Sequence, residues 1–320
     1  MNRLSDLKRM ILLLLAGILS ACSHDDLTET RPAENGEPLV LTATMADATT
    51  GTRATPDNSW EGTERFIVEV TDNYGTEAAQ IKTAVYSIDN SGKLNFVSGE
   101  QSSWLSDNET KLVRAWHYGN NSEEHPDSWS VQRDQRTGDN YAKSDLLFAQ
   151  ETVSGGQEIA LKFYHQVAKV VVHVRNVGPV YGSNEVSMTI GDYIYPVVMD
   201  GTVNMDNISE NYLNWTPGST MGTITAYSLG PQPLASNGSE TSLASFAALV
   251  IPQTVKENEC YLVINNRRME YLCYASKDIV WSAGHSYTYE VTITKESGVW
   301  VDNIIVSPWT PQDGGELVTE

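Results

Sequence analysis

The sequence predicts an all-β fold of two sandwich domains, because apolar and polar side chains alternate at a period of two along most of the chain. The alternation is clearest in residues 39–45, 168–175 and 287–294, and Gly, Asn, Asp and Ser separate such segments. No amphipathic pattern extends beyond about three helical turns. Many short, half-buried strands joined by turns are typical of antiparallel β-sandwiches.

The first 21 residues are predicted to be a lipoprotein signal peptide. Two basic residues precede an apolar run over residues 10–19, which is too short for a transmembrane helix of roughly 20 apolar residues. Residues 19–22 read Leu-Ser-Ala-Cys and resemble the lipobox of bacterial lipoproteins. The resemblance implies that Cys22 carries the lipid and begins the mature chain. The alternative is an ordinary secreted protein with a chance cysteine.

Residues 22–38 are predicted to form a disordered tether, because they contain two prolines, a glycine and several charges. Directly after the cysteine, residues 23–26 read Ser-His-Asp-Asp. They resemble the export signal of Bacteroidales lipoproteins that reach the outer face of the outer membrane. We therefore expect an outer-membrane lipoprotein at the cell surface.

Two domains follow the tether in this prediction. The N-terminal domain covers residues 39–165 and the C-terminal domain residues 166–320, which open with the strongest strand pattern, at 168–175. Residues 120–139 hold few apolar side chains and predict a long exposed loop.

Residues 259–274 predict a β-hairpin that carries Cys260 and Cys273. Asparagine tolerates a positive φ, which suits a turn centred between Asn266 and Arg267. Such a turn places the two cysteines directly opposite each other. Opposed Cβ atoms lie about 4.5–5.5 Å apart, so a disulfide needs only local adjustment, and an extracytoplasmic location permits oxidation. Two buried free thiols are the alternative.

The composition argues against several functional classes. With 21 basic and 41 acidic residues the formal charge is −20, so the surface repels phosphate backbones and no nucleic-acid partner is expected. The sequence contains no Gly-x-Ser-x-Gly elbow, phosphate loop or His-Glu-x-x-His motif. We therefore expect no enzyme activity, no cofactor and no metal site.

Aromatic and histidine residues offer little further chemistry. His117, Glu123, Glu124 and His125 lack the spacing of a helical metal site and are read as ordinary residues of a polar loop or its border. Four tryptophans could stack on sugars if they were exposed, but core anchoring is the commoner use in sandwich folds. They are Trp60, Trp104, Trp116 and Trp129.

Five sequence blocks follow one another across nearly the whole mature chain. They lie at residues 52–62, 144–170, 250–253, 281–289 and 299–309. In this order, behind a lipobox, they resemble the fimbrillin family, the subunits of Bacteroidales type V pili. The second block is the most specific, because it resembles the family's Asp-x-Leu-x-Ala … Phe-x-His-x-x-Ala-Lys pattern.

The resemblance implies two transthyretin-like β-sandwiches and a maturation step. In the family an arginine-specific protease cuts in the N-terminal domain and removes the first strand, so that the groove accepts a strand from the next subunit. Here Arg53, before Ala54, matches the cleavage position, and residues 39–46 would be the strand removed. Residues 299–320 would be the donor. An apolar face on the removed strand suits this role.

The leading hypothesis is thus a structural pilus subunit for cell adhesion, whose partners are other pilin subunits. Arg53 can also be read as an ordinary loop arginine, and Arg31 and Arg65 are alternative cleavage sites. Tip and anchor members of such pili share the fold but not always the cleavage. The runner-up is a surface glycan-binding lipoprotein of a nutrient-uptake system, which exposed coplanar tryptophans would favour.

Overall fold

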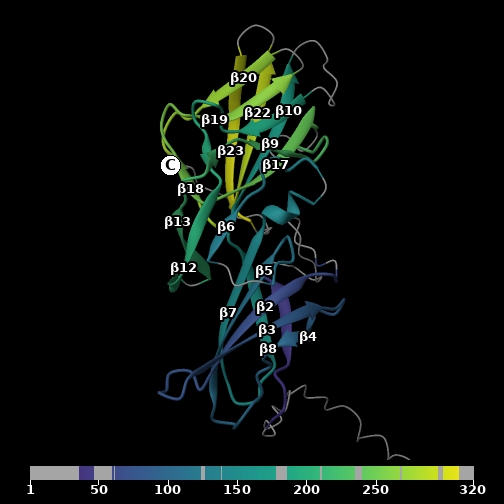
Figure 1. Ribbon diagram of the computed structural model, residues 1–320. Coiled ribbons are helices and arrows are strands. Elements are labelled where there is room, and N and C mark those ends of the chain that lie inside the picture. Colours follow the sequence, from purple (N-terminus) through teal and green to yellow (C-terminus); the bar gives the residue numbers. More distant parts are fainter. Residues whose placement is uncertain are drawn as a thin grey trace, which may run out of the picture. The chain divides into compact units, whose positions relative to one another are not determined.

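A computed structural model of the chain shows an all-β protein, as predicted (Figure 1). It describes residues 36–46, 60, 62–123, 127–137, 139–177, 186–209, 211–234, 240–266, 269–294 and 298–309. The helical content of these residues is one 3₁₀ segment, Ala142–Ser144. Among them, no helix has the length and apolarity needed to cross a membrane.

Seven strands of the N-terminal half close into a barrel, in the order β1-β4-β3-β2-β5-β7-β8. All neighbours in it are antiparallel except β1 and β8, which run parallel. The inward side chains form a core of their own, which includes Phe66, Ala115 and Phe163. The strand bounds are β1 (Leu41–Met45), β2 (Arg65–Asp72), β3 (Gln80–Ile88), β4 (Lys93–Gly99), β5 (Thr110–Tyr118), β7 (Leu146–Ser154) and β8 (Ile159–His165).

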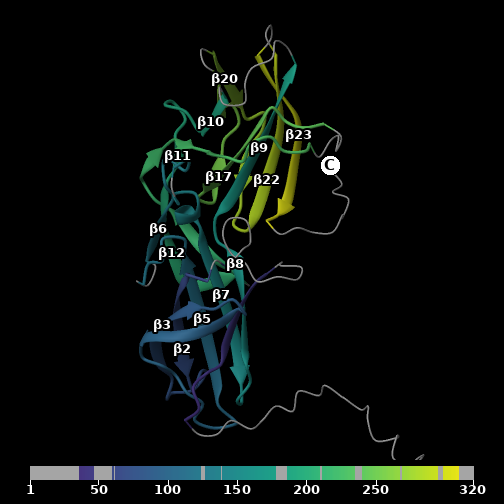
Figure 2. The same ribbon diagram turned by 90° about the vertical axis from the view of Figure 1, so that its right-hand side faces the viewer.

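A five-stranded sheet forms one layer of the C-terminal half, in the order β16-β17-β9-β22-β23. The three strands β9, β22 and β23 lie side by side in Figure 2. β9 and β22 run parallel, whereas the other pairs are antiparallel. The bounds are β16 (Tyr227–Ser228), β17 (Ala244–Val250), β9 (Ala168–Val177), β22 (His285–Thr294) and β23 (Gly298–Pro308).

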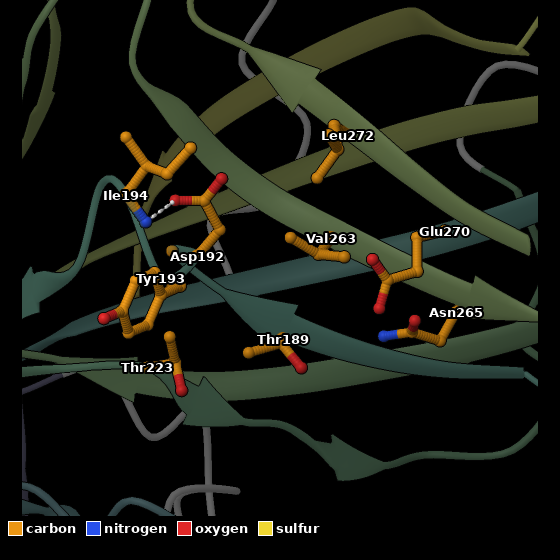
Figure 3. A pocket seen from close by; sticks show the side chains of 10 residues that line it. Thr189, Asp192, Tyr193, Ile194, Thr223, Val263, Asn265, Glu270 and Leu272 are labelled. Carbon is orange, nitrogen blue, oxygen red and sulfur yellow. Dashed lines mark hydrogen bonds between the residues drawn. The ribbon is translucent and has the colours of Figure 1, made fainter.

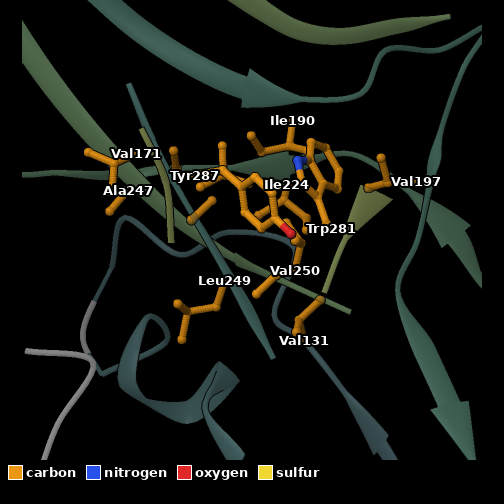
Figure 4. Close-up of a cluster of buried hydrophobic side chains, with 14 of the residues drawn as sticks. Val131, Val171, Ile190, Val197, Ile224, Ala247, Leu249, Val250, Trp281 and Tyr287 are labelled. Carbon is orange, nitrogen blue, oxygen red and sulfur yellow. The ribbon is translucent and has the colours of Figure 1, made fainter. Parts of the chain in front are cut away.

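A four-stranded sheet, in the order β15-β10-β19-β20, packs against this layer. Figure 4 shows the shared core, where Trp281 and Tyr287 lie among Ile190, Ile224 and Val250. The bounds are β15 (Ile224–Thr225), β10 (Val186–Ile190), β19 (Cys260–Asn266) and β20 (Met269–Tyr274). Smaller sheets join β13 (Tyr212–Pro217), β12 (Asp200–Ser209) and β6 (Ser128–Ser130), β11 (Val197–Val198) and β14 (Met221–Gly222), and β18 (Gln253–Val255) and β21 (Ile279–Trp281).

The chain passes from the barrel to the five-stranded sheet between His165, which ends β8, and Ala168, which begins β9. The predicted boundary at 165/166 stays a prediction, and this change of sheet supports it. The N-terminal signal peptide and most of the predicted tether lie outside the described residues.

The segment 120–139 differs from the exposed loop that its composition predicts. Ser128–Ser130 forms β6 and pairs with β12, and the side chain of Trp129 is buried. Gln135 is fully buried, where its amide oxygen accepts a hydrogen bond from the Leu249 backbone N–H and its amide nitrogen donates one to the Leu249 carbonyl, each 2.9 Å long. A polar side chain that satisfies a strand backbone in this way leaves no apolar signal in the sequence.

Candidate functional site: the first strand and its groove

β1 is an apolar plug that completes the barrel. Leu41 and Ala43 are fully buried and Met45 nearly so, whereas Val40 and Thr44, which point the other way, are exposed. The alternation predicted for residues 39–46 is therefore present in the structure. It is the pattern expected of a strand with one face in the core and one in solvent.

β1 pairs over a longer stretch with β8 than with β4. Along β8 it pairs in parallel over five positions, from Leu41 with Ile159 to Met45 with Phe163. Along β4 it pairs at two positions, where Leu41 faces Leu94 and Thr42 faces Lys93. The seam between β1 and β4 is consequently the shorter side of the closure.

An aromatic cluster lines the groove beneath β1. The rings of Trp60 and Phe66 have centroids 5.0 Å apart, and those of Phe66 and Phe163 5.1 Å apart. Phe163 is also the β8 partner of Met45. Removing β1 would expose this cluster to water, which is unfavourable by about 25 cal/mol per Å² of apolar surface. An empty groove therefore favours binding of another apolar strand.

The segment that leads into β1 is fixed by a loop of the barrel. The backbone N–H of Gly36 donates to the Trp104 carbonyl at 2.7 Å, and the N–H of Trp104 donates to the Glu37 carbonyl at 2.9 Å. Pro38 and Ser103 form an isolated β-bridge. These contacts extend the attachment of β1 beyond its ladder hydrogen bonds.

A buried ionic group, here called the lysine cluster (Lys111, Asp72, Glu109 and Ser102), anchors that loop. The Lys111 ammonium donates to the carboxylates of Asp72 at 2.5 Å and Glu109 at 2.7 Å, and Ser102 donates to Asp72 at 2.5 Å. Glu109 also accepts the Leu105 backbone N–H at 2.9 Å. Burial by itself would raise the pKa of Asp72, but hydrogen bonds from Lys111, Lys82 and Ser102 hold that pKa below its usual value.

Several predicted site residues lie outside the described part of the chain, namely Cys22, Arg53 and Ala54. Lipidation and cleavage at these positions stay predictions. Residues 299–309 of the predicted donor segment 299–320 are described, and they lie in or directly after β23, which pairs with β22 from His285 with Pro308 to Thr294 with Gly298. β23 is the edge strand of its sheet, so it pairs with β22 on one side, and it also packs against β20 of the four-stranded sheet.

Comparison with known proteins identifies the family of this chain. The sequence profile described as fimbrillin-like matches residues 52–309. The chain belongs to the fimbrillin-like family. Among curated proteins, none matches this fimbrillin-like chain significantly.

Solved structures share the fold of this fimbrillin-like protein. A candidate cell adhesion protein from Bacteroides ovatus aligns with a TM-score of 0.58 at 17% identity, covering 88% of this chain and 100% of that chain. Another, from Bacteroides uniformis, aligns with a TM-score of 0.58 at 18% identity, covering 85% of this chain and 99% of that chain. At these identities the likeness shows the fold alone.

The most specific fimbrillin-like block places Asp145 and His165 in a buried pair at the end of the barrel. The His165 ring nitrogen Nδ1 lies 3.0 Å from the Asp145 carboxylate. The same ring stacks on Trp309, with centroids 3.8 Å apart and planes 5° apart. Lys169 Nζ lies 5.6 Å from the Trp309 ring centroid. The family pattern thus joins barrel and C-terminal sheet, a role that the sequence alone did not reveal.

The predicted register of the cysteine hairpin is wrong. Cys273 faces Leu262 rather than Cys260, and Cys260 faces Tyr274 after a bulge. The extra residue of the bulge and a turn shifted toward the C-terminus move the register, which spacing alone cannot show. Both cysteines are buried free thiols in the structure, and a disulfide between them stays a prediction.

The remaining candidates from the sequence are structural. All four tryptophans singled out above are buried, so they present no stacking platform. His117 Nδ1 lies 2.9 Å from the Arg65 carbonyl, in the barrel. Within the described ranges, no group of His, Cys, Asp and Glu could hold a metal ion; Glu124 and His125 lie outside them.

Proposed function

We propose that this protein is a structural subunit of a surface pilus that serves cell adhesion, and that it acts without catalytic turnover. Its membership of the fimbrillin-like family supports this proposal. The candidate adhesion proteins with the same fold are consistent with it. In this proposal the partners are other pilin subunits, in a homopolymer or a heteropolymer.

Assembly proceeds by strand exchange in this proposal, and the observation that carries it is the geometry of β1. The strand is short, its inner face is wholly apolar, and its β4 side is paired at two positions only. Cleavage after Arg53 would detach β1 from the chain that follows it. An incoming strand would then restore both the backbone hydrogen bonds and the cover over the aromatic cluster.

The donor in this proposal is the β23 sequence. Replacing Leu39, Leu41, Ala43 and Met45 requires a strand with several apolar side chains, and residues 299–306 read Val-Trp-Val-Asp-Asn-Ile-Ile-Val. Residues 310–320 contain Leu317 and Val318 as their large apolar side chains and are a poorer match. As an edge strand, β23 would leave by breaking the backbone hydrogen bonds to one strand, β22, and its packing against β20.

Before maturation the subunit would be held on the outer membrane by acyl chains on Cys22. The test is the membrane fraction of cells that express the Cys22→Ala variant. Release of the protein, or accumulation of the unprocessed precursor, is expected. A variant cut at the same bond and still bound to the membrane would exclude the lipid anchor.

Strand exchange is tested with the purified chain lacking residues 1–22, incubated with an arginine-specific protease. Size-exclusion chromatography should show oligomers only after cleavage, and none with Arg53→Ala. Arg31→Ala, a control at an arginine in the predicted tether, should assemble like the wild type, because cleavage there leaves β1 attached to the chain that follows it. A chain ending at Trp309 should also assemble, whereas a chain ending at residue 298 should not, provided that its circular dichroism shows a folded protein.

Two outcomes would overturn strand exchange in this subunit. Cleaved wild-type protein could stay monomeric, or Arg53→Ala could assemble as well as the wild type. Either result would make a terminal position in the pilus, at the tip or the anchor, the better proposal.

A further inference from the structure

The outer face of the four-stranded sheet carries a hollow of about 400 Å³ that strand exchange does not use. Its floor is a row of facing residues, in which Thr189 of β10 pairs with Val263 of β19 and Val263 pairs with Leu272 of β20. The next row adds Asn265, which faces Glu270. The volume lies within the range of small-molecule sites, about 300–1,000 Å³.

One wall of the hollow is a loop with two large apolar side chains held in solvent. Tyr193 is 97% exposed and Ile194 is 73% exposed. Figure 3 shows Tyr193 at the end of the hollow near Thr189 and Thr223, with Asn265 and Glu270 at the opposite end. An exposed tyrosine ring beside a polar hollow offers a ligand an apolar surface together with a polar hydroxyl.

This loop is rigidly built. The Asp192 carboxylate accepts the backbone N–H groups of Ile194 at 2.8 Å and Tyr195 at 2.5 Å. Gly191 has φ +69°, and a Cβ there would lie 3.0 Å from the Tyr195 carbonyl oxygen. The Gly191 N–H donates to the Tyr261 carbonyl at 3.0 Å, which ties the loop to β19. The backbone that carries Tyr193 is therefore held in place before a ligand binds, which limits the ordering cost of binding to the side chain.

The polar side chains of the hollow reach the surface: Thr189, Thr223 and Asn265 are half-buried and Glu270 is exposed. Among the side chains drawn in Figure 3, the single hydrogen bond is that between Asp192 and Ile194. The Asn265 amide, the Glu270 carboxylate and the hydroxyls of Thr189 and Thr223 are therefore not bonded to one another. Together they offer donors and acceptors along a surface that also carries an apolar ring.

We propose that this face is a binding site for a neutral oligosaccharide. A sugar ring has an apolar C–H face that packs on a tyrosine ring, and hydroxyls that both donate and accept hydrogen bonds. The hollow supplies both kinds of contact, from Tyr193 on one side and from Asn265, Glu270 and two threonines on the other.

The charge of the hollow selects against other small ligands. Its lining contains two carboxylates and no lysine or arginine among the described residues, so an anionic glycan would be repelled. A small cation would gain little, because Asp192 is already engaged by two backbone N–H groups and Glu270 is exposed. An exposed ion pair of that kind is weak.

The site would supply the receptor contact of the proposed adhesion, and in that sense it rests on the proposed function. It involves neither β1 nor β23, so the uncleaved monomer suffices to test it. A monomer that binds no sugar while cleaved protein polymerises would refute this site alone. A subunit that binds sugar and never polymerises would refute strand exchange alone.

The test is binding of the uncleaved chain lacking residues 1–22 to an array of immobilised neutral oligosaccharides, with sialylated and sulfated glycans as a second arm. The strongest neutral ligand is then titrated by calorimetry. Tyr193→Ala should lower its affinity about tenfold or more, and Asn265→Ala should also weaken it. Tyr74→Ala, at an exposed tyrosine of the barrel, should bind like the wild type.

Thermal melting checks that each variant is folded. Because Tyr193 is exposed, its replacement is expected to leave the fold intact. Failure to bind any neutral glycan would overturn the proposal. So would binding that survives Tyr193→Ala unchanged, or binding confined to the sialylated and sulfated glycans.

Discussion

Lys111 shows how one charged residue of a β-strand can determine how a neighbouring segment is held. It lies in phase with Val113 and Ala115, whose side chains are fully buried in the barrel. The same alternation that sends those side chains inward carries the lysine ammonium into the lysine cluster. A lysine in phase with apolar core positions was a signal available in the sequence, and two carboxylates satisfy it in the structure.

Replacing Lys111 with Met should therefore destabilise the fold by about 3–5 kcal/mol, because Asp72 and Glu109 would stay buried without their cation. Lys82→Met is the matched control: this lysine also pairs with Asp72, at 2.8 Å, but its side chain is 28% exposed. Its loss should cost about 1 kcal/mol or less. Urea unfolding curves measure both, and equal losses would contradict a special role for Lys111.

The cysteine pair makes a second prediction at this scale. Burial raises the pKa of the Cys260 thiol to about 12, with a further contribution from the Asp192 carboxylate, and burial likewise raises that of Cys273 to about 12. Such thiols react slowly, because the thiolate is the nucleophile. In the chain lacking residues 1–22, a thiol reagent should label neither cysteine in the native state and both in guanidinium. A denatured chain that stays unlabelled until it is reduced would instead show the disulfide.

At the scale of single elements, β1 combines a strong core contact with a weak seam. Its inward side chains are buried about as completely as those of the other barrel strands, yet it pairs with β4 at two positions. These two properties are consistent with the proposed strand exchange, in which β1 first covers the groove and is later replaced.

Ala43→Glu should loosen β1, because it places a carboxylate at a fully buried position of the apolar barrel core. Thr44→Glu, one residue further along and exposed, should leave the strand in place. Hydrogen exchange followed by mass spectrometry of the peptide that contains residues 39–46 measures the difference. Equal protection in the two variants would mean that the inner face of β1 contributes little to its retention.

The strands predicted from the sequence are those whose own residues alternate between apolar and polar. Long alternating segments such as β1, β9 and β22 were found within one or two residues of their bounds, because burial on one face imposes the period. β6 was missed, since three residues are too few to show a period. The parallel pairings of β1 with β8 and of β9 with β22 join distant segments, and nothing local specifies them. The hairpin register failed at a bulge, which depends on the packing around Cys260.

At the scale of the whole molecule, Trp309 lies where the two halves meet. Its backbone N–H donates to the Gly284 carbonyl at 2.8 Å, and its ring stacks on His165 of the barrel. Further contacts join the halves, since Ile67, Trp116 and Phe148 of the barrel belong to the core of the C-terminal half. The sequence pattern contained these residues, but their partners could be named only from the fold.

Trp309→Ala should weaken this coupling, because a buried aromatic side chain contributes about 3–5 kcal/mol. Differential scanning calorimetry should show the single unfolding transition broaden or separate into two, as expected when domains unfold independently. Val306→Ala, on the exposed side of β23, is the control and should keep one transition. A Trp309→Ala protein with an unchanged profile would place the coupling in the apolar contacts instead.

The five-stranded sheet has a mechanical consequence. Lys169 and Ser307 both face Ser286, one on each side of β22, so the chain enters and leaves this sheet about 10 Å apart, or two strand spacings. While β23 stays paired with β22, as in the uncleaved monomer, a pull on the chain beyond Pro308 therefore reaches the barrel across one end of the sheet. The face around Tyr193 is built on the other sheet and lies off this load path. Under tension it would keep the shape that it has at rest.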